Sequence, residues 1–411
     1  MTAHNCRFCG APLKHRFVDL GSTPLANAYL TEEQLKQPEP SYPLRAFVCS
    51  ECWLVQADAF VPPEDIFSHY AYFSSYSDSW VEHARQFTVM ARKRFGLDET
   101  SQVIEVASND GYLLKHFVEA GVPVLGIEPA ENVAEVARQI GVPTEARFFG
   151  KETAADLVSR GLAADIVIGN NVLAHVPDIN DFVGGLSGVL KADGVVSVEF
   201  PHLLRLMENI QFDTVYHEHF YYLSLLAVEK VFAAHGLTVF DVEELPTHGG
   251  SLRVLACRTS STAHPTGPGV AKVRADEAAA GFNRVETYEA FQSRVAPIKD
   301  GLLAFLTEAK HNGKTVAAYG AAAKGNTLLN FCGVGTDLID YVVDRNPHKQ
   351  GHFLPGSKLP IYAPEKMDET RPDYVLILPW NIKNEVVAAN SRVGDWGGRF
   401  AVAVPELTVI G

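Results

Sequence analysis

Four cysteines near the start of the chain stand in two pairs, Cys6 with Cys9 and Cys49 with Cys52. Two such pairs let four thiolates surround one soft cation tetrahedrally, at about 2.3 Å from each sulfur. A disulfide is the weaker interpretation because the compartment is expected to be reducing, and a redox CxxC pair usually occurs singly. Four thiolates leave no ligand position open for a substrate, so the spacing predicts a structural zinc site.

A loop of small and polar residues, Ala107–Gly111, follows a short apolar run and precedes a predicted helix. Open α/β sheets bind their ligands at such loops. The next apolar run ends in Glu128, whose carboxylate can accept hydrogen bonds from both hydroxyls of a ribose. A dinucleotide fingerprint would have glycines where Ala107 and Asn109 stand, and Asp110 is acidic where a phosphate would lie. The loop therefore favours a cofactor with a cationic centre and an amino-acid tail, as in S-adenosylmethionine.

A third apolar run ends in Asn170 and Asn171, with His175 shortly after. This segment resembles the part of class I methyltransferases that runs alongside the methionine portion of the cofactor. Helix capping and turn formation are the structural alternative for these side chains. Together the loops favour a methyltransferase over an NAD-dependent oxidoreductase. The residues expected to contact S-adenosylmethionine are Ala107, Ser108, Asn109, Gly111, Glu128, Asn171, Tyr72 and Ser75.

The densest group of ionisable side chains lies at 212–224 and includes Tyr216, Glu218 and His219. It follows a predicted strand at 195–200, so it should lie at the rim of the sheet, where a substrate would bind. A His-x-His pair could ligate a metal, but no further ligand cluster accompanies it. A general base held by a carboxylate, with a phenol nearby, is the better chemical interpretation. A polar surface turn is the structural alternative.

In combination these motifs resemble the nucleotide-sugar C-methyltransferases of deoxysugar biosynthesis. The resemblance covers essentially the full chain, and its closest functional type is the 3-C-methyltransferase that acts on dTDP-4-keto-deoxyhexoses. It implies a zinc-binding N-terminal module, a middle domain that binds S-adenosylmethionine and a C-terminal Rossmann-like domain that helps to hold the nucleotide sugar. The segments that carry it, besides the cysteine pairs, are Asp19-Leu-Gly-x-x-Pro24, Ser108-Asn-Asp-Gly111, Tyr216-His-Glu-His219, His248-Gly-Gly-Ser-Leu-Arg253 and Tyr319-Gly-x-x-x-Lys324-Gly-Asn326.

The same resemblance implies catalytic roles. A ketone at C4 of the sugar acidifies the hydrogen at C3; His219 would remove that proton, and Glu218 would tune or orient the base. Tyr216 and Tyr70 could hydrogen-bond the sugar and the developing oxyanion. The enolate carbon would then attack the sulfonium methyl group, without metal chemistry.

Candidate contacts to the nucleotide sugar are Lys324, Asn326, Tyr222, His175 and His248. Lys324 and Asn326 stand in a small-residue loop that opens a helix, and helix N-termini can receive phosphate through their backbone N–H groups. The alternative is that this loop is a feature of the fold without a ligand, and that His248 is structural.

Other functions stay open at this point. The same cofactor could serve methylation at C5 or at a sugar hydroxyl, because the Tyr-His-Glu-His segment does not choose among acceptors. A zinc-ribbon scaffold or nucleic-acid adaptor with a degenerate methyltransferase domain is an interpretation of a different class. The formal net charge of −14 opposes general binding to nucleic acid.

Alternating apolar runs and helical patterns must position these residues. The middle of the chain has apolar runs at 103–106, 124–127, 166–168 and 195–200, with helical patterns at 112–120, 130–140 and 181–190. This alternation predicts an α/β fold with a mostly parallel, doubly wound sheet. Two further runs, 237–243 and 251–257, suit an antiparallel hairpin that closes the sheet edge. A second series predicts a C-terminal Rossmann-like unit, with runs at 315–319, 338–343, 374–378 and 400–404.

The chain of 411 residues is long enough for two or three domains. We expect a zinc-binding module at 1–62, a methyltransferase domain at 63–258, a connector and helical segment at 259–310, and the Rossmann-like domain at 311–411. The start lacks the pattern of a secretory signal, and no apolar stretch approaches the roughly 18–20 residues that span a bilayer. These features predict a cytoplasmic location, with a nucleotide-diphosphate sugar as substrate and neither nucleic acid nor membrane as partner.

Overall fold

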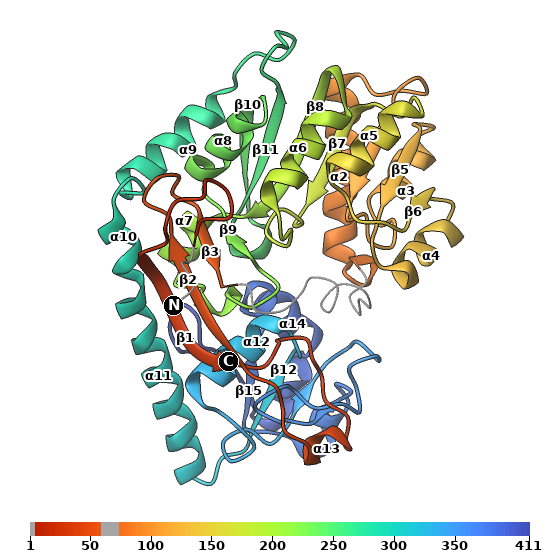
Figure 1. Ribbon diagram of the computed structural model, residues 1–411. Coiled ribbons are helices and arrows are strands. Elements are labelled where there is room, and N and C mark those ends of the chain that lie inside the picture. The colour runs from red at the N-terminus through yellow and green to blue at the C-terminus, as the bar shows by residue number, and fades with distance from the viewer. Residues whose placement is uncertain (1–4, 59–73) are drawn as a thin grey trace.

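The computed structural model of the protein describes residues 5–58 and 74–411, and Figure 1 shows their path. Two predicted site residues, Tyr70 and Tyr72, lie outside the described residues. Within these ranges the strands form three sheets. In the part of the chain that the structure describes, no helix has the length and apolar character needed to cross a membrane.

The first sheet is small and antiparallel, and Cys49 follows its second strand directly. Its strands, in spatial order, are β1 (His15–Thr23), β2 (Tyr42–Val48), β3 (Val55–Ala57) and β9 (Tyr221–Tyr222). Strand β9 comes from much later in the chain and pairs with β3, so that Gln56 lies opposite Tyr221. The N-terminal sheet therefore takes one edge strand from the segment that carries His219.

The second sheet confirms the predicted doubly wound unit. In spatial order its strands are β10 (Leu237–Leu245), β11 (Ser251–Arg258), β8 (Leu190–Pro201), β7 (Ala164–Asn170), β4 (Val103–Val106), β5 (Val124–Ile127) and β6 (Thr144–Glu145). The strands from β8 to β6 are parallel, while β11 and β10 add an antiparallel hairpin at the edge, as predicted.

Helices pack on this sheet, and they explain why its central strands are continuous apolar runs. All four residues of β4 are buried, including Glu105. Helix α2 begins after Ser77, whose hydroxyl accepts a hydrogen bond from the Trp80 N–H, and ends at Gly96 in the left-handed conformation. The helices of this unit are α2 (Asp78–Phe95), α3 (Leu114–Glu119), α4 (Glu131–Gln139), α5 (Lys151–Ser159), α6 (Ile179–Val189), α7 (Leu203–Glu208) and α8 (Leu225–Ala234).

The third sheet confirms the second predicted α/β unit. Its strands, in spatial order, are β14 (Ile361–Tyr362), β13 (Val342–Val343), β12 (Val316–Tyr319), β15 (Tyr374–Ile377), β16 (Arg399–Val402) and β17 (Thr408–Ile410). All neighbouring pairs are parallel except β16 and β17. Its helices are α12 (Ala323–Cys332), α13 (Lys366–Thr370) and α14 (Lys383–Ala389).

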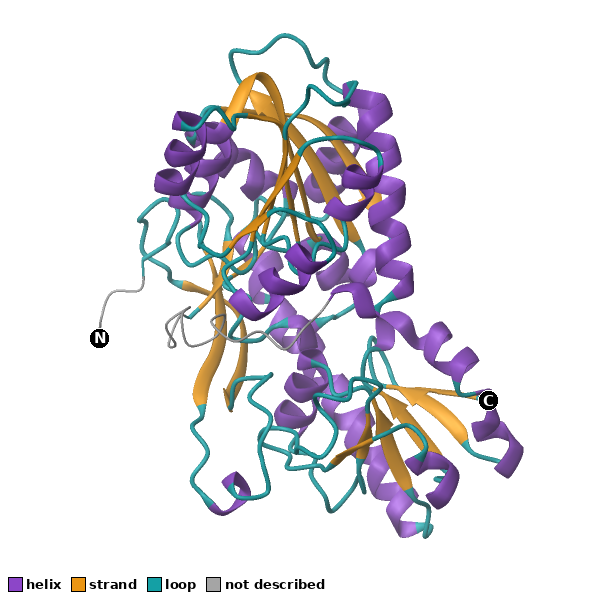
Figure 2. Ribbon diagram, turned by 90° about the vertical axis from the view of Figure 1, so that its right-hand side faces the viewer, coloured by secondary structure: helices purple, strands orange, loops and turns teal. Residues whose placement is uncertain are grey.

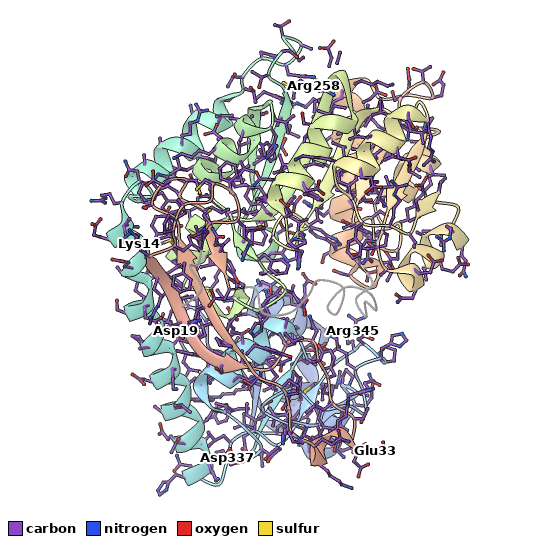
Figure 3. All side chains as sticks on the ribbon, in the orientation of Figure 1. Lys14, Asp19, Glu33, Arg258, Asp337 and Arg345 are labelled. Carbon is purple, nitrogen blue, oxygen red and sulfur yellow. The ribbon has the colours of Figure 1, made fainter. Side chains whose placement is uncertain are left out.

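Three helices run down one side of the molecule and connect the second sheet to the third (Figures 1 and 2). They are α9 (Pro268–Ala279), α10 (Val285–Glu289) and α11 (Phe291–His311). Phe17 of β1 stacks on Phe291 with ring centroids 4.6 Å apart, so the N-terminal sheet packs on this connection. Charged side chains such as Lys14, Arg258 and Asp337 lie at the periphery of the molecule (Figure 3). Contacts such as the pairing of β9 with β3 and the stacking of Phe17 on Phe291 join different predicted domains, and the domain boundaries stay a prediction.

Candidate active site

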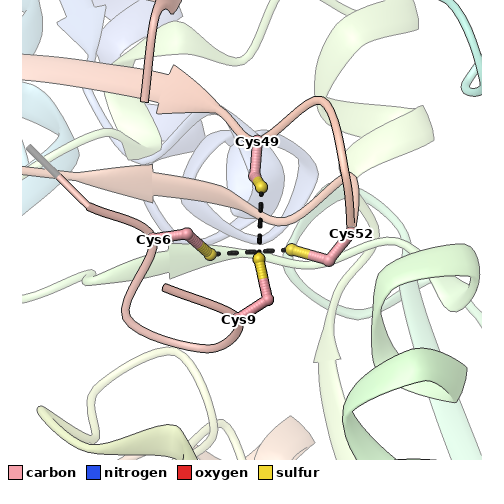
Figure 4. A group of neighbouring side chains, drawn as sticks. All are labelled: Cys6, Cys9, Cys49 and Cys52. Carbon is pink, nitrogen blue, oxygen red and sulfur yellow. Dashed lines mark hydrogen bonds between the residues drawn. The ribbon is translucent and has the colours of Figure 1, made fainter. Parts of the chain in front are cut away.

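The four predicted zinc ligands converge at one end of the N-terminal sheet, as Figure 4 shows. Their sulfur atoms all lie within 4.8 Å of one another, with 3.6 Å between Cys6 and Cys52 and 3.5 Å between Cys9 and Cys49. A tetrahedron with Zn–S bonds of about 2.3 Å has edges of about 3.8 Å, so the donor set fits zinc. The Gln56 amide also donates a hydrogen bond to the Cys6 sulfur at 3.1 Å. Such a second contact orients a metal-binding thiolate.

The loop after β4 has the backbone shape of a glycine-rich loop. Ala107 and Asn109 have φ of 54° and 51°, and Gly111 has φ of 79°. Residues other than glycine rarely adopt positive φ, at a cost on the order of 1 kcal/mol or more each, and such strain concentrates at ligand sites. Ala107 and Asn109, which stand where a dinucleotide fingerprint would have glycines, are therefore the two residues of the loop with a strained backbone.

Glu128 holds this loop against the end of β5. Its carboxylate accepts hydrogen bonds from the backbone N–H groups of Asn109 (3.0 Å) and Ala130 (2.9 Å). Burial raises the pKa of Glu128, while these two bonds act in the opposite direction. Beneath the loop, Gly126 leaves room for the Ser108 hydroxyl, because a Cβ at Gly126 would lie 2.5 Å from the Ser108 Oγ.

Buried acceptor atoms gather at the carboxyl ends of β4 and β7. These oxygens have no hydrogen-bond partner among the described residues: Glu105 Oε2, Ser108 Oγ, Asp110 Oδ1, Asn170 Oδ1 and Asn171 Oδ1. Buried polar atoms normally have partners, so a cluster of lone acceptors indicates a ligand that donates hydrogen bonds. The ammonium group and ribose hydroxyls of S-adenosylmethionine are such donors, whereas a pyrophosphate would meet carboxylates of its own charge. The residues present therefore fit S-adenosylmethionine.

Two further predicted cofactor residues border this cluster. The Ser75 side chain is exposed, but its backbone N–H donates to the Asp110 carboxylate at 3.1 Å. Asn171 has φ of 54°, donates its backbone N–H to the Glu199 carbonyl at 2.7 Å and donates its side-chain amide to His248 Nε2 at 3.1 Å. Asn171 thereby links the cofactor loops to a residue predicted to contact the substrate.

His219 lies in a group of rings beside the cofactor loops. Its Nδ1 is 2.9 Å from the Thr214 carbonyl, which can only accept, so Nδ1 carries the proton and Nε2 keeps its lone pair. The ring centroids of Tyr216 and His175 lie 4.0 Å and 4.7 Å from that of His219. Burial lowers the pKa of His219 well below its ordinary value, and His175 and Lys324 act in the same direction. His219 is therefore a neutral imidazole with a defined basic atom.

Glu218 has surroundings different from those the sequence suggests. Its two carboxylate oxygens accept hydrogen bonds from the Asn27 side-chain amide at 2.7 and 2.9 Å. His219 donates its orienting hydrogen bond to the Thr214 carbonyl rather than to Glu218. Glu218 and His219 are adjacent in the sequence but have different partners: Asn27 for Glu218, and Thr214 and His175 for His219. Burial raises the pKa of Glu218 to about 7, against the lowering effect of Asn27 and Lys349.

The predicted substrate contacts fall into two groups. Lys324 donates to the Asn381 side chain at 2.7 Å and lies 4.7 Å above the Trp380 ring. Its charge lowers the pKa of both His219 and His248, which places its ammonium group at the same site. Asn326 is buried instead, and its amide donates to the Ala26 carbonyl at 2.5 Å. Asn326 thus ties the N-terminal segment to α12.

Of the other three substrate candidates, His175 and Tyr222 pack near His219, whereas His248 contacts Asn171 and Trp80. Burial lowers the pKa of His175 to about 4 and that of His248 to about 4, so both rings are neutral. The Tyr222 ring centroid lies 6.3 Å from that of His219, and burial raises the pKa of this phenol. A phenol that stays protonated can donate a hydrogen bond to a developing oxyanion.

Sequence reasoning missed a buried polar network next to the cofactor loops. Glu199 is fully buried at the end of β8, 2.8 Å from His83 and 3.2 Å from Arg253, and it accepts the Thr247 hydroxyl at 2.9 Å. Trp80 stacks on His83 at 4.9 Å and approaches His248 at 5.1 Å. The signal in the sequence was an acidic residue inside an apolar strand, which a buried strand accommodates only with partners.

Comparisons with known proteins agree with this architecture. Family models match in chain order, as a zinc binding domain (6–67), a methyltransferase domain (80–242) and a C-methyltransferase C-terminal domain (246–405). The C-methyltransferase NovU of Streptomyces niveus is 38% identical over 405 residues, which cover 98% of this chain and 96% of NovU.

Other matches are less similar and cover less than half of the chain. A ubiquinone biosynthesis O-methyltransferase of Bartonella quintana is 27% identical over 101 residues, 24% of this chain and 41% of that protein. The structure of magnesium protoporphyrin IX methyltransferase (ChlM) from Synechocystis PCC 6803 with bound SAM is 17% identical, covers 43% of this chain and 77% of that one, and has a TM-score of 0.33.

The methyl donor is S-adenosylmethionine and the cysteine cluster binds zinc, which confirms both predicted cofactors. The alternatives of an NAD-dependent oxidoreductase and of a non-catalytic scaffold are set aside. Because the similarity to NovU extends over nearly the whole of both chains, this protein belongs to the family of S-adenosylmethionine-dependent C-methyltransferases with an N-terminal zinc-binding domain.

Proposed function

We propose that this C-methyltransferase acts on C3 of a nucleotide-linked 4-keto-deoxysugar, with His219 as the base that forms the enolate. The observation that carries the proposal is the state of His219. Its Nδ1 is bound to the Thr214 carbonyl, and its pKa is well below the ordinary value. Nε2 is therefore available as a proton acceptor across the neutral pH range.

Carbon methylation needs a base and a way to stabilise the resulting anion. His219 Nε2 takes the C3 proton, and the electron pair of the broken C–H bond delocalises onto the C4 carbonyl oxygen. The Lys324 ammonium group and the Tyr222 phenol offer positive charge and a hydrogen bond to that oxygen, and the Tyr216 ring packs against the base at a tilt. S-adenosylmethionine, when bound, supplies an electrophilic methyl group.

Lys324 also supports a nucleotide diphosphate as part of the substrate. It lies in the first turn of α12, where backbone N–H groups and the helix dipole favour an anion. Burial lowers the pKa of Lys324, and the nearby Asp213 carboxylate, which accepts the Trp380 indole N–H at 2.7 Å, acts in the opposite direction. This cation offsets locally the formal net charge of −14.

Solvent exchange tests the proposal directly. Incubation of the protein with a dTDP-4-keto-deoxyhexose and S-adenosylhomocysteine in D2O should introduce deuterium at C3. His219→Asn should slow this exchange at least about 100-fold, which is the usual contribution of a general base. His311→Asn, at the exposed end of α11, is the matched control and should exchange normally.

Product analysis with S-adenosylmethionine decides among methyl acceptors. A product of one added methyl group, located at C3 by NMR, is the expected result. Methylation at C5 or at a hydroxyl, or exchange that persists in His219→Asn, would overturn the assignment.

A further inference from the structure

Arg7, between the zinc ligands Cys6 and Cys9, reaches the segment that carries the proposed base. Its guanidinium donates to the carbonyl of Ala57 at 2.9 Å, to the carbonyl of Phe220 at 2.8 Å and to the Tyr221 hydroxyl at 3.3 Å. It also lies 4.9 Å above the Tyr221 ring. These contacts span more than two hundred residues of sequence and end on the residue next to His219.

The zinc knuckle holds Arg7 from the other side. The Arg7 backbone N–H donates to the Gln56 side-chain oxygen at 3.0 Å, and the same amide donates to the Cys6 sulfur. The Asn180 amide donates to the Arg7 carbonyl at 3.1 Å. The position of the guanidinium is therefore set by the metal site and by α6 together.

The segment after His219 is fixed between two parts of the molecule. The Phe220 carbonyl accepts from the Ala57 N–H at 3.0 Å as well as from Arg7, which joins it to the N-terminal sheet. The Phe220 N–H donates to the Ala174 carbonyl at 2.7 Å, next to His175. The His175 and His219 rings make an edge contact, and the Phe220–Ala174 hydrogen bond joins the residues that neighbour them in the sequence.

We infer that Arg7 is a positioning residue for catalysis, which couples the zinc site to the placement of His219 by holding the Phe220 carbonyl. This inference rests on the proposed role of His219. A guanidinium suits the task because its planar fork bonds two carbonyls at once, which a lysine ammonium group does not reproduce. A displacement of about 1 Å in a reacting group can cost on the order of 100-fold in rate.

The test compares Arg7→Gln and Arg7→Lys with the control Arg16→Gln, an exposed arginine of β1 that pairs with Asp19. Zinc content is measured for each, and NMR of ¹³Cε1-labelled histidine gives the pKa of His219, assigned with His219→Asn. In Arg7→Gln, we expect bound zinc, a His219 pKa shifted upward as water enters, and kcat reduced at least about tenfold. The KM for S-adenosylmethionine should change by less than about twofold, because Arg7 does not touch the cofactor loops.

The titratable and charged groups around His219 are His175, Lys324, His248, Tyr216 and Tyr222, and all are unchanged in these variants. A shift in its titration therefore reports a change in position or solvation. Arg7→Lys should show a smaller shift of the same sign, and it decides the question if Arg7→Gln does not fold. An unchanged His219 titration and kcat in the folded variant would refute the inference. Full turnover by His219→Asn would instead refute the base assignment, while the NMR result would still test Arg7.

Discussion

Three neutral histidines at one site determine how this protein should respond to acid. Burial lowers the pKa of His175 and His248 to about 4 and that of His219 well below its ordinary value of about 6.5. In the unfolded chain each takes up a proton near pH 6.5, whereas in the folded chain it does so only at much lower pH. The unfolded state thus binds more protons between these values, and stability falls as the pH falls through this window.

We therefore predict that His248 makes the protein lose stability between pH 7 and pH 5, whereas Glu218, with its pKa raised to about 7, acts in the opposite direction. Each buried histidine contributes up to about 1.4 kcal/mol per pH unit at the acid end of the window. Urea unfolding at pH 7.5, 6.0 and 5.0 measures this slope. His248→Gln, which keeps an acceptor for the Asn171 amide, should lose less stability toward pH 5 than wild type does, whereas His311→Asn should match wild type. An equal slope in His248→Gln and wild type would contradict the buried neutral state.

The same site shows how far individual residues can be predicted. Cysteine spacing was sufficient for the zinc ligands because four thiolates have few other common uses. The partner of His219 was not predictable, since a backbone carbonyl such as that of Thr214 carries no sequence signal. Asn27 presents the same difficulty, because its bond to Glu218 joins segments far apart in the chain.

At the scale of elements, the parallel strands were predictable because each is a continuous apolar run between helical patterns. Strand β9 was not, because two residues have no periodicity, and its pairing with β3 depends on how the N-terminal sheet docks. Strands β1 and β2 are longer but were also missed, because adjacent apolar residues such as Phe17 with Val18 and Phe47 with Val48 interrupt any alternation of apolar and polar residues. Strand β6, two residues long like β9, escaped in the same way as β9.

Strand β5 has one glycine, Gly126, whose backbone packs closely beneath the cofactor loop. Gly126 lies beneath Ser108, and a Cβ there would lie 2.5 Å from the Ser108 Oγ and 2.9 Å from the Thr144 Oγ1. We predict that Gly126→Ala displaces the Ser108 hydroxyl and weakens S-adenosylhomocysteine binding about tenfold, equivalent to about 1.4 kcal/mol. Calorimetric titration measures the affinity. Gly301→Ala, in α11 with open space around its Cβ, is the control, and equal affinities in both variants would show that the loop tolerates the methyl group.

At the scale of the whole molecule, the candidate active site lies where parts of three sheets meet. The cofactor loops end strands of the second sheet, Lys324 begins α12 of the third, and His219 precedes the strand that completes the first. A contact such as the Tyr29 hydroxyl on the Ala321 carbonyl, at 2.6 Å, links the first sheet's chain to the third directly. The zinc ligands do not contact the proposed reacting groups, but Arg7 between them holds the segment that carries His219.

Loss of zinc should therefore lower turnover more than cofactor binding. Cys9→Ser removes the one exposed ligand, and metal binding contributes directly to the folding of such a module. We expect reduced zinc content, a Tm lower by several °C and a reduced kcat, because β3 and Arg7 no longer hold the segment around Phe220. The affinity for S-adenosylhomocysteine should stay within about twofold, because Glu128 holds the cofactor loop between the ends of β4 and β5.

Comparison with Ser50→Ala, a change inside the second knuckle that keeps every thiolate, separates the metal from the loop around it. A double variant, Cys9→Ser with Arg7→Gln, adds a further condition. If zinc acts through Arg7, the losses in kcat should be less than multiplicative, because both changes release the same carbonyl. Multiplicative losses would mean that zinc supports the site by another route. Full turnover by a folded Cys9→Ser protein without zinc would show that the metal is dispensable for catalysis.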